Sequence, residues 1–149
     1  LTWLPDRPYT AGEWGYVNGK GRSTTSEIYN TVDGPVYQTW MEDITEYKID
    51  APAGTYEVEL LMADVSRPAR QQANLLGKGD ERASAVSKRF DITISGEVVE
   101  QNFSPADNNR YLNACRRRYI VNNNDGCIDI RFTPLQGKPV LSGLKVRRL

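Results

Sequence analysis

Two runs of alternating polar and apolar residues most constrain what this chain can fold into. They span residues 54–65 and 88–96. A period of two places every second side chain on the same face of a strand, so each run predicts a strand with one buried face. The side chains expected in the core are Tyr56, Val58, Leu60, Met62, Phe90, Ile92 and Ile94. Core strands separated by a polar insertion favour a β-sandwich whose function lies in its loops.

Turn signals divide the rest of the chain into short segments. Residues 1–34 are rich in Gly, Ser, Thr and aromatics, and we expect them to form an irregular N-terminal arm. The segments 95–97 and 123–126 carry hairpin signals, the second stronger than the first. Further strands are expected near 36–41, 45–50, 98–103, 118–122, 127–132 and 139–148. The predicted fold is all-β, a jelly-roll-like antiparallel β-sandwich with one short helix in a long loop.

That long loop is the insertion at 66–88. It opens with Ser66, places Pro68 in a first helical turn and continues with helix formers up to Gly77. These are the ordered signals of a short helix. The remainder, 78–87, has no periodicity and predicts a mobile loop.

Composition excludes several classes of protein. The chain has 149 residues, which suit one domain, and its 19 basic residues balance 19 acidic ones. The zero net charge argues against broad attraction to nucleic acid or to an anionic membrane. The sequence contains no apolar run of about 18 residues, so it predicts no membrane-spanning helix.

The arginines at 116–118 and 147–148 are expected to be solvated. Because the chain starts at Leu1 rather than Met, we expect it to be part of a longer protein.

The sequence offers little for catalysis. It contains no histidine and two cysteines, which excludes Ser-His-Asp and Cys-His nucleophile systems as well as zinc sites. Glycoside cleavage needs two carboxylates, but no pair stands in an acid–nucleophile signature. The candidates considered are Asp33, Asp43, Asp64, Asp91 and Asp107. Asp64 and Asp91 lie in or beside core strands, where a structural hydrogen-bonding role is expected. We therefore predict no catalytic residue and no cofactor. Whether the domain holds a structural calcium ion is left open.

The predicted hairpin at 123–126 sets an expectation for the cysteines. In that register Cys127 lies beside the turn and Cys115 far along the ladder, at a separation of nearly ~20 Å. A disulfide needs Cα atoms within about 7 Å. We therefore expect two free thiols.

Aromatic residues are the candidates for binding sugar. A pyranose ring stacks its apolar face on Trp or Tyr, while its hydroxyls need polar partners. Two interpretations stay open. In the first, Trp14, Tyr29 and Trp40 cover the edge of the sandwich, the commoner role of large aromatics. In the second, Tyr16 and Tyr37 form a ligand rim beside the insertion.

Several short motifs together resemble the malectin-like carbohydrate-binding domains. They are Val36-Tyr-Gln-Thr39, Pro52-x-Gly54-x-Tyr56-x-Val58, Ala63-Asp64, Arg89-Phe-Asp-Ile-Thr-Ile-Ser-Gly96 and Pro139-Val-Leu-Ser-Gly-Leu-Lys-Val146. The opening Asp6-Arg-Pro-Tyr9 with Trp14-Gly-Tyr16 resembles the copies near the C-terminus of bacterial glycoside hydrolase family two enzymes of the β-galactosidase type. The resemblance covers residues 6–148.

The resemblance implies a non-catalytic accessory domain that binds or positions an oligosaccharide or polysaccharide. It implies that Tyr37, and more loosely Tyr16, contacts glycan. Trp14 beside Tyr16, and Arg67 and Arg70 in the insertion, are further ligand candidates; the arginines could also be an exposed helix face. The sequence departs from the family after Ala63-Asp64, where the expected aromatic pair is absent.

Two alternatives stay open beside this one: a structural domain that braces a parent enzyme, and a stand-alone hydrolase. The partners expected from the resemblance are glycan and other domains of a parent hydrolase, at an extracytoplasmic location, periplasmic or on the cell surface, in a bacterium.

Overall fold

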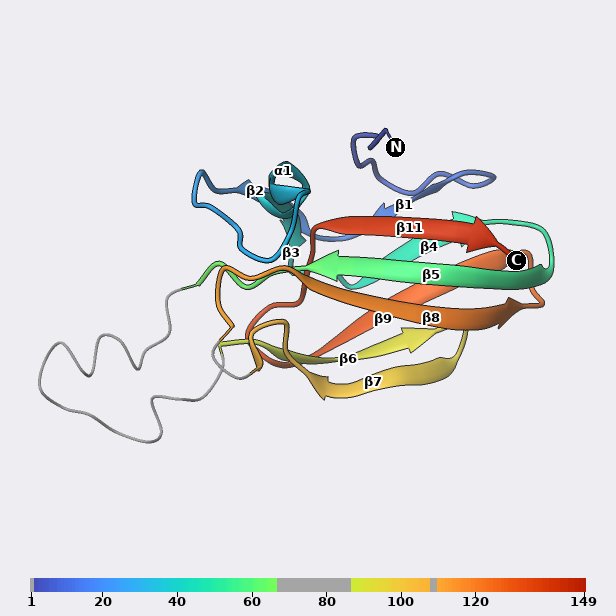
Figure 1. Cartoon of the computed structure of the whole chain (residues 1–149). Helices are drawn as coiled ribbons and strands as arrows, with labels where there is room; N and C mark the ends of the chain where they lie inside the picture. The colour runs from blue at the N-terminus through green and yellow to red at the C-terminus, as the bar shows by residue number, and fades with distance from the viewer. Residues whose placement is uncertain (1, 67–86, 108–109) are drawn as a thin grey trace, which may run out of the picture.

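The computed structural model describes residues 2–66, 87–107 and 110–149, and it is an antiparallel β-sandwich with a small third sheet at one end (Figure 1). In chain order the elements are β1 (Trp14–Val17), β2 (Lys20–Ser23), α1 (Gly34–Tyr37), β3 (Thr39–Glu42), β4 (Glu46–Asp50), β5 (Gly54–Met62), β6 (Arg89–Ile94), β7 (Glu97–Phe103), β8 (Cys115–Asn123), β9 (Cys127–Gln136), β10 (Val140–Leu141) and β11 (Gly143–Arg148). The prediction of an all-β antiparallel sandwich is confirmed, while the short helix α1 lies at a different place from the helix predicted in the insertion.

Two sheets form the sandwich. One has the strand order β1-β4-β9-β6-β7, and the other has the order β11-β5-β8. Figure 1 shows β11, β5 and β8 lying across β4, β9, β6 and β7. The third sheet, β10-β3-β2, lies with α1 at the end of the molecule where β5 finishes. The hollows described below lie at this end.

The main core lies between the two large sheets, and it confirms the alternation seen in the sequence. Every side chain predicted to be buried on β5 and β6 is at most 5% exposed. On β9, Ile128, Ile130 and Phe132 enter the same cluster, while Cys127, Asp129 and Arg131 point away from it. Burying an aliphatic or aromatic side chain stabilises the fold by about 1.5–3 kcal/mol, so this cluster holds the two layers together.

A second, smaller cluster lies on the outer side of β5. Tyr37 of α1 packs there with Ile28, Leu61 and Ala63. Val36 lies against Gly143 of β11, where an added Cβ atom would meet the Val36 side chain at 3.0 Å. This contact docks α1 onto the outer face of the three-stranded sheet.

The prediction of a strand at 36–41 is wrong in its first half. Gly34–Tyr37 is a helical turn with Pro35 in its first positions, and the strand begins only at Thr39. Proline is well suited to the start of a helix, since its missing N–H has no partner there in any case. The turn moves Tyr37 off the sheet and into the second cluster.

The prediction of an irregular N-terminal arm is also corrected, because β1 and β2 lie within residues 1–34. The Asn18-Gly19 turn joins them, and both of its residues have positive φ, 58° and 119°. The strands separate after the turn: β1 pairs with β4 of the large sheet, and β2 pairs with β3. The predicted helix and mobile loop of the insertion lie outside the described residues.

The two hairpin predictions have opposite outcomes. Residues 95 and 96 join β6 to β7 as an antiparallel pair, as expected. Residues 124–126 instead connect the two sheets: β8 pairs with β5, whereas β9 pairs with β4 and β6. The buried Asn123 holds this crossing, since its amide donates to the carbonyl oxygens of Ala51 and Pro52 at 3.0 and 3.2 Å.

Both cysteines are free, which agrees with the prediction, but the register argument behind it is wrong. Cys115 lies opposite Met62 in the three-stranded sheet. Cys127 lies opposite Asp50 in the five-stranded sheet.

Candidate functional site

A hollow of about 610 Å³ lies between the third sheet and the N-terminal segment. It is lined by Asp6, Gly21, Arg22, Ser23, Thr39, Trp40, Met41, Leu141 and Ser142. The pairing of β2 with β3 builds it, because this register sets Arg22 opposite Trp40 and Ser23 opposite Thr39. Trp40 is half-buried, so part of its ring remains accessible. The hollow thus combines an aromatic surface with a guanidinium and several hydroxyl groups.

Some polar groups of this hollow already form hydrogen bonds within the protein. The Arg22 Nε donates to the Glu42 Oε2 at 3.2 Å, and the Asp6 carboxylate accepts from the Tyr47 hydroxyl at 2.9 Å. The Ser142 hydroxyl is buried and has no hydrogen-bond partner among the described residues.

A second hollow, of about 590 Å³, lies beside α1. It is lined by Asn30, Thr31, Val32, Tyr37, Ala114 and Arg116. Arg116 pairs with Glu59 at 2.8 Å and approaches Asp33 at 3.8 Å. Its guanidinium also lies by the Tyr37 hydroxyl, whose pKa is raised by burial and partly lowered again by this arginine.

The expectation that Tyr37 lies at a solvent-accessible rim near Tyr16 is wrong. Tyr37 is 1% exposed, so its ring cannot present a face for stacking on sugar. The cause is the helical turn at α1, which directs the side chain into the second cluster. Tyr16 lies on β1 and packs against the main core instead.

The remaining predicted ligand residues lie elsewhere. Trp14 on β1 packs against the main core, and the Arg7 guanidinium lies 4.1 Å from the centre of its ring. Neither Trp14 nor Tyr16 lines either hollow. Arg67 and Arg70 lie outside the described residues. The structure therefore does not bring Tyr37, Tyr16 and Trp14 together at one hollow. One of the two sequence interpretations assigns Trp40, the aromatic that lines the first hollow, to the sandwich edge.

Two of the carboxylates that were candidates for catalysis, Asp64 and Asp91, have structural roles. Asp64 is fully buried, accepts from the Ser66 N–H at 2.8 Å and also accepts from the Ser87 hydroxyl. Asp91 accepts from the Asn102 N–H at 2.8 Å. The hydrogen-bonding roles predicted for Asp64 and Asp91 are confirmed.

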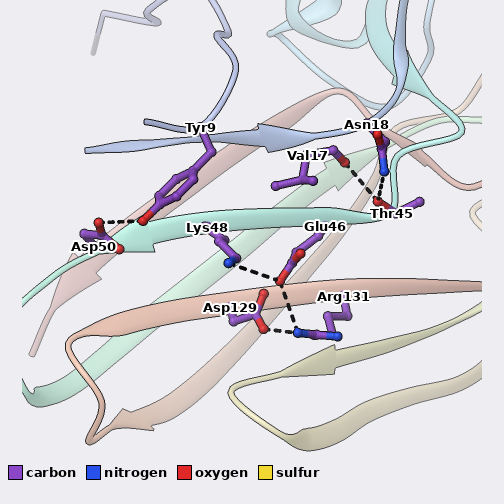
Figure 2. Close-up of polar contacts among 9 residues, drawn as sticks. All are labelled: Tyr9, Val17, Asn18, Thr45, Glu46, Lys48, Asp50, Asp129 and Arg131. Carbon is purple, nitrogen blue, oxygen red and sulfur yellow. Dashed lines mark hydrogen bonds and ion pairs between the residues drawn. The ribbon is translucent and has the colours of Figure 1, made fainter. Parts of the chain in front are cut away.

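A carboxylate cluster that sequence reasoning missed lies on the outer face of the five-stranded sheet. Figure 2 shows Glu46 of β4 and Asp129 of β9 beside one another, with Lys48 and Arg131 on either side. Arg131 contacts Asp129 at 2.9 Å and Glu46 at 3.4 Å. The hydrogen bond with Asp129, followed by burial, raises the pKa of Glu46. The cluster lines neither of the two hollows described above.

Metal and membrane features were also considered in the part of the chain that the structure describes. No group of three or more His, Cys, Asp or Glu side chains there is arranged to hold a metal ion. No helix among those residues has the length and apolar character needed to cross a membrane.

Comparisons with known proteins place the chain in a family. The family profile of the malectin domain matches residues 2–143. A search of curated proteins found no match. Among solved structures, a β-glucuronidase of Bacteroides uniformis is similar to the whole chain, with 42% identity and a TM-score of 0.85. The chain spans 16% of that enzyme's length.

Two plant proteins share the fold at lower identity. The receptor-like kinase ANX1 has 16% identity over 98% of this chain and 42% of its own, with a TM-score of 0.68. The receptor-like kinase FER has 15% identity over 95% of this chain and 36% of its own, with a TM-score of 0.66.

Proposed function

The chain belongs to the malectin domain family, and from that premise we propose that it is a non-catalytic accessory domain of a bacterial glycoside hydrolase that binds glycan in the hollow beside Trp40. The parent enzyme proposed is of glycoside hydrolase family two. The relative with 42% identity is a β-glucuronidase, so that activity replaces the β-galactosidase type suggested by the sequence motifs. We place the parent enzyme in the periplasm or on the cell surface.

The half-buried ring of Trp40 carries this proposal. Sugar recognition needs an accessible aromatic face with polar groups around it, because the pyranose ring stacks while its hydroxyls seek partners. Arg22, Ser23 and Thr39 line the same hollow and supply such partners.

The test is glycan binding by the 149-residue chain and its variants. A glycan array first identifies a bound oligosaccharide, and calorimetry then measures its affinity. Trp40→Ala is expected to weaken binding about 5- to 150-fold through the lost stacking surface, whereas Trp40→Phe keeps much of the affinity. Trp14→Ala is the matched control, since Trp14 is also half-buried but lies outside the hollow. Unchanged affinity in a folded Trp40→Ala variant would remove the hollow from the function.

A second candidate function is that the domain braces its parent enzyme without binding sugar. The observation that favours it is the burial of Tyr37, the residue that the resemblance implies contacts glycan, which is only 1% exposed. Deleting the domain from the parent enzyme separates the two functions. If the deletion abolishes hydrolysis of the polymer but leaves hydrolysis of small glycosides and thermal stability unchanged, the domain binds glycan. Loss of stability together with both activities indicates a brace.

A further inference from the structure

The outer face of the three-stranded sheet carries an ordered pattern of charge. The register sets Lys145 of β11, Glu59 of β5 and Arg118 of β8 in one row across the sheet. The next row holds Arg147, Glu57 and Ile120. Cations therefore stand on the strands at both sides of a central pair of glutamates. At the α1 end, Arg116 lies two positions before Arg118 and points to the same side.

The glutamates lie beneath the arginines. Arg118 Nε contacts the Glu57 Oε1 at 3.1 Å, and Arg147 Nη2 contacts the Glu57 Oε2 at 2.8 Å. The side chain of Glu57 is 16% exposed and that of Glu59 only 7%. Arg118 is 59% exposed and Arg147 is 70% exposed. Solvent therefore meets guanidinium groups on this face, with the compensating carboxylates underneath.

The positive charge on this face is only partly neutralised. Four cationic side chains, Arg116, Arg118, Lys145 and Arg147, surround the two glutamates. Asp33 adds a carboxylate at the α1 end only, 3.8 Å from Arg116. Arg118 and Arg147 share Glu57 as their close partner, so the positive charge that is not balanced lies around Arg118, Lys145 and Arg147.

Two strands of the other outer face have the opposite sign. On β4 and β9, the carboxylates of Glu46, Asp50 and Asp129 outnumber the cations Lys48 and Arg131 (Figure 2). The arginine-rich face and this part of the opposite face therefore differ in the sign of their charge. Because oriented surface charge attracts and aligns a charged partner, the arginine-rich face is suited to a polyanion.

We propose that this face, defined by Arg118, Lys145 and Arg147, binds an acidic polysaccharide through the carboxylate or sulfate groups of the sugars. The free N–H groups of Arg118 and Arg147 can each form a bidentate bond to an oxyanion, because guanidinium and carboxylate geometries match. The backbones of the two arginines flank β5, about two strand spacings or ~10 Å apart. Their guanidinium groups converge above Glu57, so both can engage one extended chain. This surface is separate from the hollow beside Trp40.

The test measures binding of the 149-residue chain to polygalacturonate, with uncharged dextran as the comparison polymer. The wild type is expected to bind polygalacturonate and not dextran, with an affinity that falls steeply as salt rises. Arg147→Gln is expected to weaken binding about tenfold, and Arg118→Gln with Arg147→Gln to weaken it further, since each removes a charge-assisted bond. Arg147→Lys keeps the positive charge but loses the planar guanidinium that forms two parallel bonds. Its affinity is therefore expected to lie between those of the wild type and Arg147→Gln.

Arg131→Gln is the matched control, because Arg131 is similarly exposed, at 63%, on the opposite face. It should leave polygalacturonate binding unchanged. Failure of the wild type to bind polygalacturonate at low salt overturns the proposal, and the face then fits a neighbouring protein domain instead. Equal loss in Arg131→Gln and Arg147→Gln overturns it as well, because net charge alone would then explain binding.

Discussion

The carboxyl pair of Glu46 and Asp129 leads to a prediction about pH and stability. Neither the Glu46 Oε2 nor the Asp129 Oδ1 has a hydrogen-bond partner among the described residues. Two ionised carboxylates contain no donor, so a proton shared between them would supply the missing bond. This is the first cause of the raised pKa of Glu46, whose ordinary value is 4.5, and burial is the second.

The sign of the effect follows from linkage. A carboxyl group whose pKa is higher in the folded than in the unfolded chain stabilises the fold at acid pH, where it is protonated. That contribution is lost as pH rises from 4.5 through the folded pKa of Glu46. Glu46→Gln should prevent this loss of stability at higher pH, because the glutamine amide donates a hydrogen bond to the Asp129 carboxylate at every pH.

The magnitude is set by one gained hydrogen bond and two weakened ion pairs. The bond contributes about 0.5–1.5 kcal/mol. The lost pairs are the long contacts to Arg131 and Lys48, at 3.4 and 4.0 Å, and exposed pairs of this kind contribute a few tenths of a kcal/mol. Arg131 keeps its 2.9 Å contact with Asp129. The expected net gain at neutral pH is up to about 1 kcal/mol, or a Tm increase of about 2–4 °C for a chain of this size.

The assay is thermal unfolding across a pH series, with Glu57→Gln as the matched control. The hydrogen bond from Arg147 is the first cause that lowers the pKa of Glu57, so its carboxylate stabilises the fold at neutral pH and this contribution fades as pH falls. Glu46→Gln should raise Tm at neutral pH and lose its advantage in acid. Glu57→Gln should lower Tm at neutral pH and approach the wild type in acid. A Glu46→Gln variant less stable than the wild type at neutral pH would refute the shared-proton reasoning.

Three further predictions concern packing and the thiols. Tyr37→Ala should destabilise the fold by about 3–5 kcal/mol in denaturant unfolding, because the ring is 1% exposed, whereas Tyr37→Phe should cost far less. Gly15→Ala should destabilise by about 1–3 kcal/mol in the same assay, since its Cβ would lie 2.4 Å from the backbone of Pro8 and Tyr9, while Gly21→Ala, with open space around it, serves as the control. Burial first, and then the neighbouring Asp50, raises the pKa of Cys127 to about 11, so alkylation of this thiol in the native chain should be slow at neutral pH and accelerate toward that value.

The core was predictable because alternation is a local property of a strand. The predicted inward residues of β5, β6 and β9 are buried, since a period of two leaves no freedom in which face a side chain occupies once the strand forms. The turn at residues 95 and 96 was predictable because a tight turn is also a local property. Both residues have positive φ, which suits a two-residue hairpin.

The candidate site was less predictable, because exposure depends on packing rather than on motif. The Val36–Thr39 segment does lie between the two hollows, with Tyr37 lining one and Thr39 the other. Sequence alone could not show that Gly34 and Pro35 begin a single helical turn, which is too short to carry a helical pattern. That turn buries the Tyr37 ring and leaves Trp40, on β3, as the hollow-lining aromatic that is still partly exposed.

The arginine runs show where local reasoning ends. Their side chains are solvated, as predicted, but solvation alone describes neither their partners nor the sign of the surface they form. Arg118 and Arg147 are 29 positions apart in the sequence, and they meet at Glu57 because β8 and β11 both pair with β5. The same sequence signal that wrongly suggested a hairpin at 123–126 would have paired β8 with β9, and would have set Arg118 among the carboxylates of the other sheet. The charge of each residue is therefore readable from the sequence, whereas the charge of each face depends on strand order, and strand order was the part of the fold that the turn signals could not determine.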